Sequence, residues 1–168
     1  MYRVESISVP TFANETPVPD LGTYLGQEVV NMLAEFPDLK IVGGEDRSTD
    51  AVLIGRIISS PSRYNAVTNS QYLSSDSVAP LNTGGRNPFL VPSANSTLMT
   101  AQFTLMSHEG KVLWFKELPY QTRYTVELYD GESASVTVTQ TLENARRSYK
   151  NSAKNVAKSL RSLVIDAF

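Results

Sequence analysis

Residues 50–59 read Asp-Ala-Val-Leu-Ile-Gly-Arg-Ile-Ile-Ser, a run that is rich in β-branched side chains. Such side chains pack well on a pleated surface that is at least half-buried. The run therefore predicts a buried β-strand, and the segments on both sides of it supply the other elements of the predicted fold.

A helix is predicted before this strand, over residues 20–36. Apolar residues recur there at steps of three and four, which places them along one face of a helix. Asp20 is the expected N-cap residue, and a proline follows the last turn. Two short strands are predicted around this helix, over residues 3–9 and 38–42, and residues 11–19 are predicted to form a loop.

A long β-hairpin is predicted after the strand. Residues 97–107 and 111–125 read as two extended runs, joined by the turn His108-Glu109-Gly110. Pro119 is expected to break or bulge the second run and to favour a place at the sheet edge. Residues 127–139 are acidic and then rich in Ser and Thr, and they are predicted to form a loop.

A second helix is predicted over residues 140–166, with two stripes of different character. The apolar stripe consists of Leu142, Ala145, Tyr149, Ala153, Val156, Leu160, Leu163 and Val164. The basic stripe consists of Arg147, Lys150, Lys154, Lys158 and Arg161. At about 100° per residue the stripes lie roughly 130° apart, so one face is buried while the other is cationic. The basic stripe is either a solvated helix face or a surface for an anionic partner.

This order of elements predicts an α+β fold over residues 1–168 as a single domain. We expect a two-layer sandwich, with two helices packed on one face of a mostly antiparallel sheet of four to five strands. Residues 60–96 are rich in Ser, Asn, Pro, Gly and Thr and predict a long loop or hairpin extension. The isolated aromatic side chains in that segment suggest docking on a partner.

Composition excludes several chemistries. The sequence has no cysteine, which rules out disulfides, thiolate metal sites and cysteine nucleophiles. Its single histidine, His108, lies in the predicted hairpin turn, which argues against a catalytic triad and a zinc site. We therefore expect no catalytic residue, no metal and no cofactor. The net charge of −2 and the lack of a recognisable motif argue against nucleic acid as a partner.

The phrase Ile7-Ser-Val-Pro-Thr-Phe-Ala-Asn-Glu-Thr16 combines a strand ending in Val-Pro, the pattern Phe-x-Asn-x-Thr and an amphipathic helix. This combination resembles the LptE family of lipopolysaccharide-assembly lipoproteins. Residues 50–55 resemble that family's "D-A-V-L-x-G" strand, and residues 98–114 resemble its central hairpin. The short strand after the first helix and the terminal basic helix follow in the same order. Only residues 60–96 remain unmatched.

The resemblance implies a lipid-anchored protein on the periplasmic side of the outer membrane. Its partners would be the LptD barrel, which it supports and plugs from inside, and lipopolysaccharide, and it would have no catalytic activity. In the family the mature N-terminus is an acylated cysteine, whereas this sequence begins Met1-Tyr2-Arg3. We therefore expect the lipid anchor to be missing from this chain.

A phosphorylated glycolipid requires arginine or lysine next to exposed apolar groups. The candidate contacts with lipopolysaccharide or a partner are Arg63, Tyr64, Arg86, Phe89 and Arg123. Arg123 stands beside Tyr120 and Tyr124 in the predicted edge strand. The alternative for each arginine is an ordinary surface residue. Phe12, Asn14 and Thr16 are expected to shape the strand-to-helix turn rather than to bind a ligand.

Two other functions stay open at the level of the sequence. Phe-x-Asn-x-Thr after a strand also occurs in envelope lipoproteins that regulate a peptidoglycan synthase. Those proteins usually continue with alternating β-α units, whereas residues 97–126 predict a long hairpin. A small hydrolase is the third reading, because Glu127, Asp130 and Glu132 cluster in sequence.

Overall fold

The computed structural model describes residues 4–46, 48–59, 70–72, 90–92, 94–125 and 134–164. The chain forms two compact units, which are described separately. The first unit consists of residues 1–62, 98–121 and 149–168, and the second of residues 63–97 and 122–148. The four β-strands before residue 60 and the first helix belong to the first unit.

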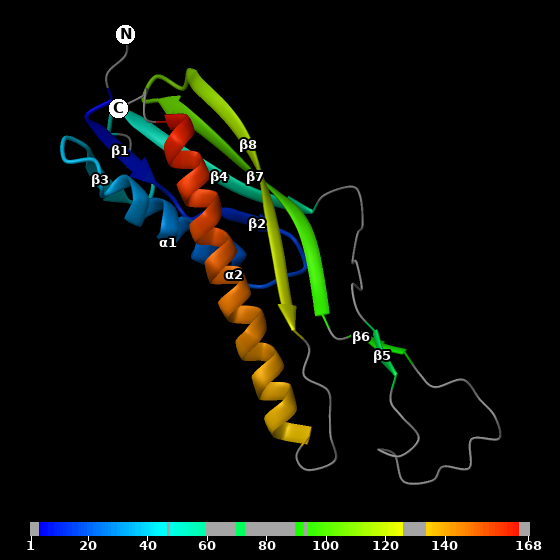
Figure 1. Ribbon diagram of the computed structural model, residues 1–168. Coiled ribbons are helices and arrows are strands. Elements are labelled where there is room, and N and C mark those ends of the chain that lie inside the picture. The colour runs from blue at the N-terminus through cyan, green and yellow to red at the C-terminus, as the bar shows by residue number, and fades with distance from the viewer. Residues whose placement is uncertain are drawn as a thin grey trace, which may run out of the picture. The chain divides into compact units, whose positions relative to one another are not determined.

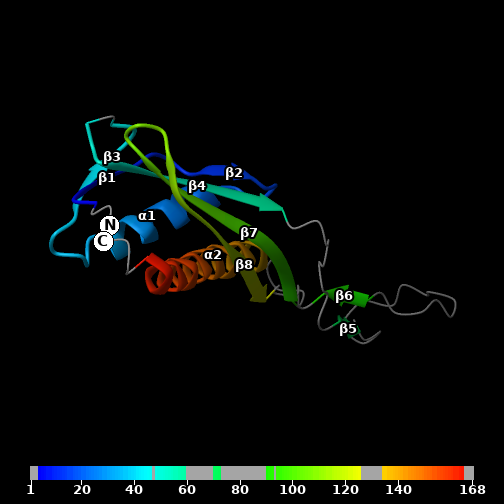
Figure 2. The ribbon, with the colours of Figure 1, turned by 90° about the horizontal axis from the view of Figure 1, so that it is seen from above.

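The main sheet has six strands in the order β3-β1-β4-β7-β8, with β2 pairing to β4 (Figure 1). Its strands are β1 (Ser6–Val9), β2 (Ala13–Glu15), β3 (Lys40–Gly43), β4 (Ala51–Ser59), β7 (Ala94–Ser107) and β8 (Val112–Thr125). The helices are α1 (Leu21–Leu33) and α2 (Ala134–Val164). Both pack against one face of the sheet (Figure 2), which confirms the predicted two-layer α+β sandwich. In the second unit, β5 (Ser70–Tyr72) and β6 (Leu90–Pro92) form an antiparallel pair inside the predicted long loop or hairpin extension.

The sheet is mixed, where the sequence predicted a mostly antiparallel arrangement. β1 pairs in parallel with both β3 and β4, and β2 also pairs in parallel with β4. The cause is α1, which carries the chain back to the start of the sheet before β3 begins, as a crossover helix does between parallel strands. β4 pairs with β7 in the antiparallel direction. The sixth strand is β2, which lies in the predicted loop over residues 11–19.

β1 and β2 together form one interrupted strand along β4. Ser8 is opposite Val52 and Ala13 is opposite Arg56, so five steps on one strand face four steps on the other. The extra residue produces a bulge after Pro10, which has no main-chain N–H for a ladder. The bulge turns Phe12 towards the core, where it is 3% exposed.

Phe12 connects the bulge to α1 and β4. Its ring packs edge-to-face on Phe103, with 5.9 Å between the ring centroids and 73° between the ring planes. Gly55 of β4 lies directly beneath the ring, because a Cβ there would come within 2.4 Å of the Phe12 Cγ. A Cβ at Gly22 of α1 would come within 2.4 Å of the Phe12 carbonyl oxygen. Gly55 therefore makes room for the Phe12 ring, and Gly22 makes room for the Phe12 main chain.

The turn between β2 and α1 is built by Asn14 and Thr16, as predicted. Asn14 Nδ2 donates to the Val18 carbonyl oxygen at 2.7 Å. Asn14 Oδ1 accepts from both the main-chain N–H and the hydroxyl of Thr16, at 3.1 and 2.7 Å. The asparagine thereby replaces backbone partners that the turn leaves open.

α1 begins directly after Asp20, so the predicted N-cap position is confirmed. The capping mechanism differs, because Asp20 has a φ of 62° and its side chain makes no cap hydrogen bond. Its carbonyl oxygen accepts from Tyr24 N–H at 3.0 Å. The helix ends at Leu33, and the chain continues in tight turns through Phe36, which was the predicted helix end.

Asp50 ties the start of β4 to the start of β1. Its Oδ2 accepts from Glu5 N–H at 3.1 Å and from the N–H and hydroxyl of Ser6, both at 2.8 Å. Asp50 N–H donates back to the Ser6 hydroxyl oxygen at 2.9 Å. The Ser6 side chain, followed by the Ser6 N–H, lowers the pKa of Asp50 because both favour the ionised carboxylate.

α2 starts at Ala134, six residues before the predicted boundary at residue 140, so the predicted loop over 127–139 was wrong for its last part. The buried stripe is close to the predicted one and consists of Ala145, Ala153, Val156, Ala157, Leu160 and Val164. Leu142 and Leu163 were predicted on this stripe but are 56% and 44% exposed. Leu163 stands at the border of the stripe, since Leu160 and Val164 beside it are 0% and 1% exposed.

Two bases of the predicted basic stripe hold α2 against α1. Lys150 Nζ lies 5.6 Å from the centre of the Tyr24 ring. Arg161 forms an ion pair with Glu35 at 2.5 Å and lies 5.9 Å from the centre of the Phe36 ring. The later residue of α2 thus contacts the later residues of the α1 segment, so α1 and α2 run in the same general direction. Part of the cationic face therefore serves helix packing.

β8 is an edge strand, as predicted from Pro119, but the proline does not break it. In β8, the alternation between side chains that face the core and side chains that face away changes phase before the proline. The adjacent residues Leu113 and Trp114 both pack against the core. One extra residue at this place is typical of a β-bulge. Beyond it, Tyr120 and Thr122 are buried, and Gln121 between them is exposed.

Candidate functional site

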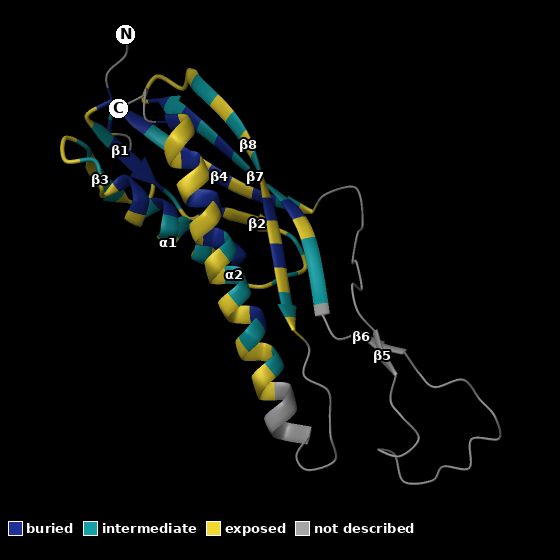
Figure 3. Ribbon diagram, viewed as in Figure 1, coloured by how far each residue is buried: buried dark blue, intermediate teal, exposed yellow. Residues whose placement is uncertain are grey.

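The face of the sheet away from the helices is the candidate site. Along β4 and β7 the core takes alternate residues, among them Leu53, Ile57, Ala101 and Phe103 (Figure 3). The residues between them form the helix-free face, which consists of Val52, Ile54, Arg56 and Ile58 of β4 and Leu98, Thr100, Gln102, Thr104 and Met106 of β7. All of these belong to the first unit.

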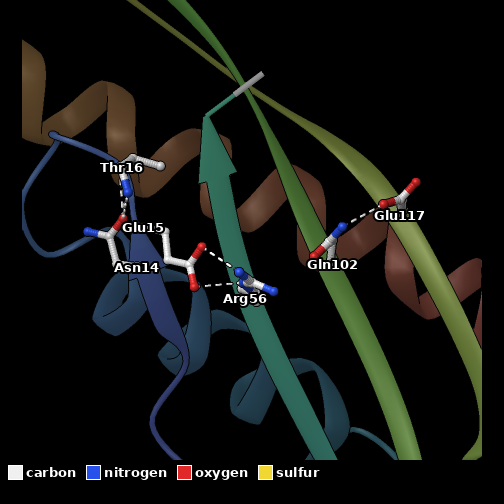
Figure 4. A network of polar contacts seen from close by, with 6 residues as sticks. All are labelled: Asn14, Glu15, Thr16, Arg56, Gln102 and Glu117. Atoms are coloured by element: carbon white, nitrogen blue, oxygen red, sulfur yellow. Dashed lines mark hydrogen bonds and ion pairs between the residues drawn. The ribbon is translucent and has the colours of Figure 1, made fainter. Parts of the chain in front are cut away.

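A row of polar side chains crosses this face over four strands (Figure 4). Arg56 donates to both carboxylate oxygens of Glu15, with distances of 2.8 Å from Nε and 2.6 Å from the terminal nitrogen. Gln102 is directly opposite Arg56 in the β4–β7 register, and its Nε2 donates to Glu117 Oε1 at 2.7 Å. The contact with Gln102 places Glu117 of β8 on the helix-free face.

Exposed apolar side chains lie next to this polar row. Ile54 of β4 lies two residues before Arg56, is opposite Thr104 of β7 and is 41% exposed. Phe115 precedes Glu117 by two residues on β8, so it projects from the same face, and it is 51% exposed. Leu98 on β7 is 37% exposed. β4 thus carries apolar residues on both of its faces, a pattern typical of strands that are covered on both sides.

This face combines a bidentate ion pair with exposed apolar side chains. The arginine and the carboxylate of residue 15 neutralise each other in a bidentate pair, which fixes the orientation of both side chains. Both are about half-exposed, so the pair contributes little to stability. Aromatic and apolar side chains together with paired polar groups are characteristic of interfaces.

Of the predicted contact residues, Arg63, Tyr64, Arg86 and Phe89 lie outside the described residues. Arg123 is exposed in the second unit, where its main-chain N–H donates to Ser148 Oγ at 3.0 Å.

The aromatic neighbours predicted for Arg123 are only partly in place. In the second unit, the Tyr124 hydroxyl accepts from Asn95 Nδ2 at 3.1 Å. Tyr120, in contrast, is fully buried in the first unit. Its hydroxyl donates to the Tyr149 carbonyl oxygen at 2.9 Å, and burial raises the pKa of Tyr120. The prediction that Tyr120 supplies exposed apolar surface beside the arginine is therefore wrong, because residue 120 faces the core.

His108 is a turn residue, as predicted. It lies in the β7–β8 turn, and its main-chain N–H donates to the Asp50 carbonyl oxygen at 3.0 Å. Its side chain is 50% exposed and 3.9 Å from Glu109. The predicted acidic cluster of residues 127, 130 and 132 lies outside the described residues.

Within the described ranges between residues 4 and 164, no group of three histidine, cysteine, aspartate or glutamate residues is arranged to hold a metal ion. None of the helices in these ranges is long and apolar enough to cross a membrane.

The residues of the helix-free face were not identified from the sequence. A signal was present in the run Val-Leu-Ile-Gly-Arg-Ile-Ile over residues 52–58, where apolar residues occupy both alternate positions and one arginine interrupts them. The partners of that arginine could not be read from sequence, because Glu15 is 41 residues away and pairs with it only through the parallel contact of β2 and β4.

No protein-family model and no curated protein matches this sequence. Similar solved structures include a minor lipoprotein from Acinetobacter baumannii, with a TM-score of 0.45, 12% identity and coverage of 95% of this chain and 92% of that one. Rare lipoprotein B from Shewanella oneidensis has a TM-score of 0.42 and 12% identity, with coverage of 95% of this chain and 97% of that one. A PelC dodecamer from Paraburkholderia phytofirmans has a TM-score of 0.41 and 16% identity, with coverage of 92% of this chain and 89% of that one. The first two are bacterial lipoproteins; with TM-scores below 0.5, none of the three carries an argument about function.

Proposed function

We propose that this chain is a non-enzymatic component of lipopolysaccharide assembly at the outer membrane. It supports and plugs an LptD-type barrel, contacts lipopolysaccharide and is carried on the periplasmic side of the membrane by an N-terminal lipid anchor. This is the role of the LptE family, which the sequence resembles.

The observation that supports the proposal is the contact between the two phrases that carry the resemblance. Phe12 of the first phrase packs on Gly55 of the second, and Asp50 at the head of the second phrase binds Ser6, directly before the first. Residues more than 40 positions apart thus depend on each other for packing and hydrogen bonding. Matches that interlock in this way favour one shared structural pattern over two unrelated coincidences.

The helix-free face supports the docking part of the proposal. It combines exposed Ile54 and Phe115 with the Arg56–Glu15 ion pair, and the Glu117 carboxylate accepts a hydrogen bond from Gln102, so these polar groups already have partners when a protein surface covers them. The long β7–β8 hairpin also differs from the alternating β-α units expected of the lipoproteins that regulate a peptidoglycan synthase.

The test is co-purification of a lipidated, full-length form from its native host. Recovery of an LptD-type barrel is the expected result. We expect Ile54→Lys and Phe115→Lys to lower this recovery about tenfold or more, because each buries a charge in the interface. Leu163→Lys is the matched control, since residue 163 is similarly exposed but lies on α2.

Other outcomes contradict the proposal in distinguishable ways. Recovery of a peptidoglycan synthase in place of the barrel indicates the regulator function. Absence of both proteins together with turnover of a glycan indicates a hydrolase.

A further inference from the structure

We propose that the amino-terminal half of β8, residues 112–118, accepts an extended strand from a partner protein and so lengthens the sheet. This edge borders the helix-free face and shares Phe115 and Glu117 with it, but it would bind through its main chain, whereas the proposed docking of the helix-free face uses side chains.

The two edges of the sheet differ in their capacity to bind a strand. On one side the edge is formed by β3, with four residues, and by β2, with three residues. β8 at the other edge has fourteen residues. Natural proteins usually keep edge strands short or charged, because a long edge offers unpaired N–H and C=O groups to another chain. A long apolar edge that is retained therefore points to an interaction.

The far end of β8 is already covered. In the second unit, Arg123 N–H donates to Ser148 Oγ, and the Thr125 carbonyl oxygen accepts from Asn144 Nδ2 at 3.3 Å. Both partners come from α2, so side chains of this helix take the place of a neighbouring strand there. For residues 112–118, no described residue outside the sheet makes a hydrogen bond to the main chain.

Pro119 marks the boundary between the covered and the open part. The Arg123 N–H points away from β7, and burial alternates regularly from Glu117 to Thr125. Residue 119 therefore occupies a position whose N–H would also point outwards. Proline has none, so an added strand loses its ladder there. By the same alternation, Glu117 N–H points outwards and is the last donor of the open part.

The side chains that flank the open edge favour an extended, partly apolar partner. Val112 and Phe115 are 53% and 51% exposed, and they lie beside the main chain that the partner would pair with. Lys116 and Glu117 are adjacent, so their opposite charges lie on opposite faces of the sheet. A partner strand in register would therefore carry an acidic side chain on the face of Lys116 and a basic side chain on the face of Glu117.

The experiment distinguishes the contribution of the residue 117 main-chain N–H to binding from the contribution of its side chain. Glu117→Pro removes the outward N–H, whereas Glu117→Ala keeps it and removes only the side-chain contact with Gln102. A photo-crosslinking residue placed at Val112 in the full-length, lipidated protein captures the partner in its native host. Mass spectrometry of the product then identifies the partner segment, and hydrogen exchange of the purified complex reports on the β8 amides.

We expect the crosslinked partner segment to be extended, the amide of residue 117 to be protected in the complex of the Glu117→Ala variant, and crosslinking to be about tenfold lower for Glu117→Pro than for Glu117→Ala. Thermal unfolding of both variants confirms that they fold. The proposal is overturned by no crosslink at residue 112, by equal crosslinking of both variants, by a product that maps to a helix, or by a product with a second copy of this chain. The identity of the captured protein tests the barrel function independently: a partner other than the barrel leaves the strand acceptor intact.

Discussion

The ring of Phe12 occupies the space in which a side chain at Gly55 would lie. A Cβ at residue 55 would come within 2.4 to 2.6 Å of three ring carbons, closer than any non-bonded contact allows. The ring is enclosed by the core and packs on Phe103, so it has no free direction in which to move. Glycine at this position is thus required by the aromatic residue 43 positions before it.

Gly55→Ala is therefore expected to lower the free energy of unfolding by about 1–3 kcal/mol, the usual cost of overpacking a core. Urea unfolding followed by circular dichroism measures this. Gly43→Ala is the control, since nothing lies within 4 Å of a Cβ there, and its effect should stay within about 0.5 kcal/mol. Equal effects of the two substitutions would contradict the packing described for the ring.

Asp50 predicts a loss of stability in acid. Its hydrogen bonds with Ser6 and Glu5 lower the pKa of the carboxyl in the folded state below the unfolded value of about 3.9. The contribution is therefore complete above pH 4 and is lost as the pH falls through the lowered pKa. Unfolding of wild type and Asp50→Asn at pH 7 and pH 3 should show a difference in stability that shrinks in acid.

The control for this prediction is Glu45→Gln, which removes an exposed acid from the loop before β4. It should leave the free energy of unfolding at pH 7 within about 0.5 kcal/mol of the wild-type value. A stability difference between wild type and Asp50→Asn that persists undiminished at pH 3 would show that the ionised carboxylate is not what binds β1.

Two serines on the same strand are expected to respond in opposite directions. Ser6 Oγ makes two hydrogen bonds with Asp50, whereas Ser8 Oγ is fully buried and meets no partner within the described part of the chain. Ser8→Ala should raise the free energy of unfolding by about 1 kcal/mol, because it removes a desolvated hydroxyl without breaking a bond. Ser6→Ala should lower it by about 1–2 kcal/mol for the opposite reason. Chemical unfolding of both variants decides this, and a destabilised Ser8→Ala would indicate an unrecognised partner of that hydroxyl.

Tyr120→Phe is expected to cost about 1 kcal/mol of stability, since it keeps the buried ring and removes only the hydrogen bond with the Tyr149 carbonyl oxygen. Burial raises the pKa of Tyr120, so its phenol should stay protonated while exposed tyrosines ionise in alkali. Absorbance titration of wild type against the variant should therefore show the same number of tyrosines ionising until the protein unfolds. An additional titrating group in the wild type would place this hydroxyl in water.

Periodicity in the sequence was sufficient for the elements that have one buried face. The helices around Leu25 and Val156, the strand over residues 51–59 and the hairpin turn at His108 were all predicted, because alternation or steps of three and four depend only on local geometry. Local side-chain hydrogen bonding was sufficient for the Asn14–Thr16 turn. The start of α2 was misplaced, because Ser and Thr have no apolar period that extends a helix.

Only the tertiary structure decided which strands are neighbours and what lies on the second face of the sheet. Strand direction depends on the crossover made by α1, and the row from Glu15 to Glu117 joins β2, β4 and the β7–β8 hairpin, which are far apart along the chain. The sequence itself determined that β4 has apolar residues on both faces, since that is a property of consecutive residues. It could not determine that, within the described part of the chain, the helices cover only one of these faces, because covering is a contact between distant segments and leaves no local period.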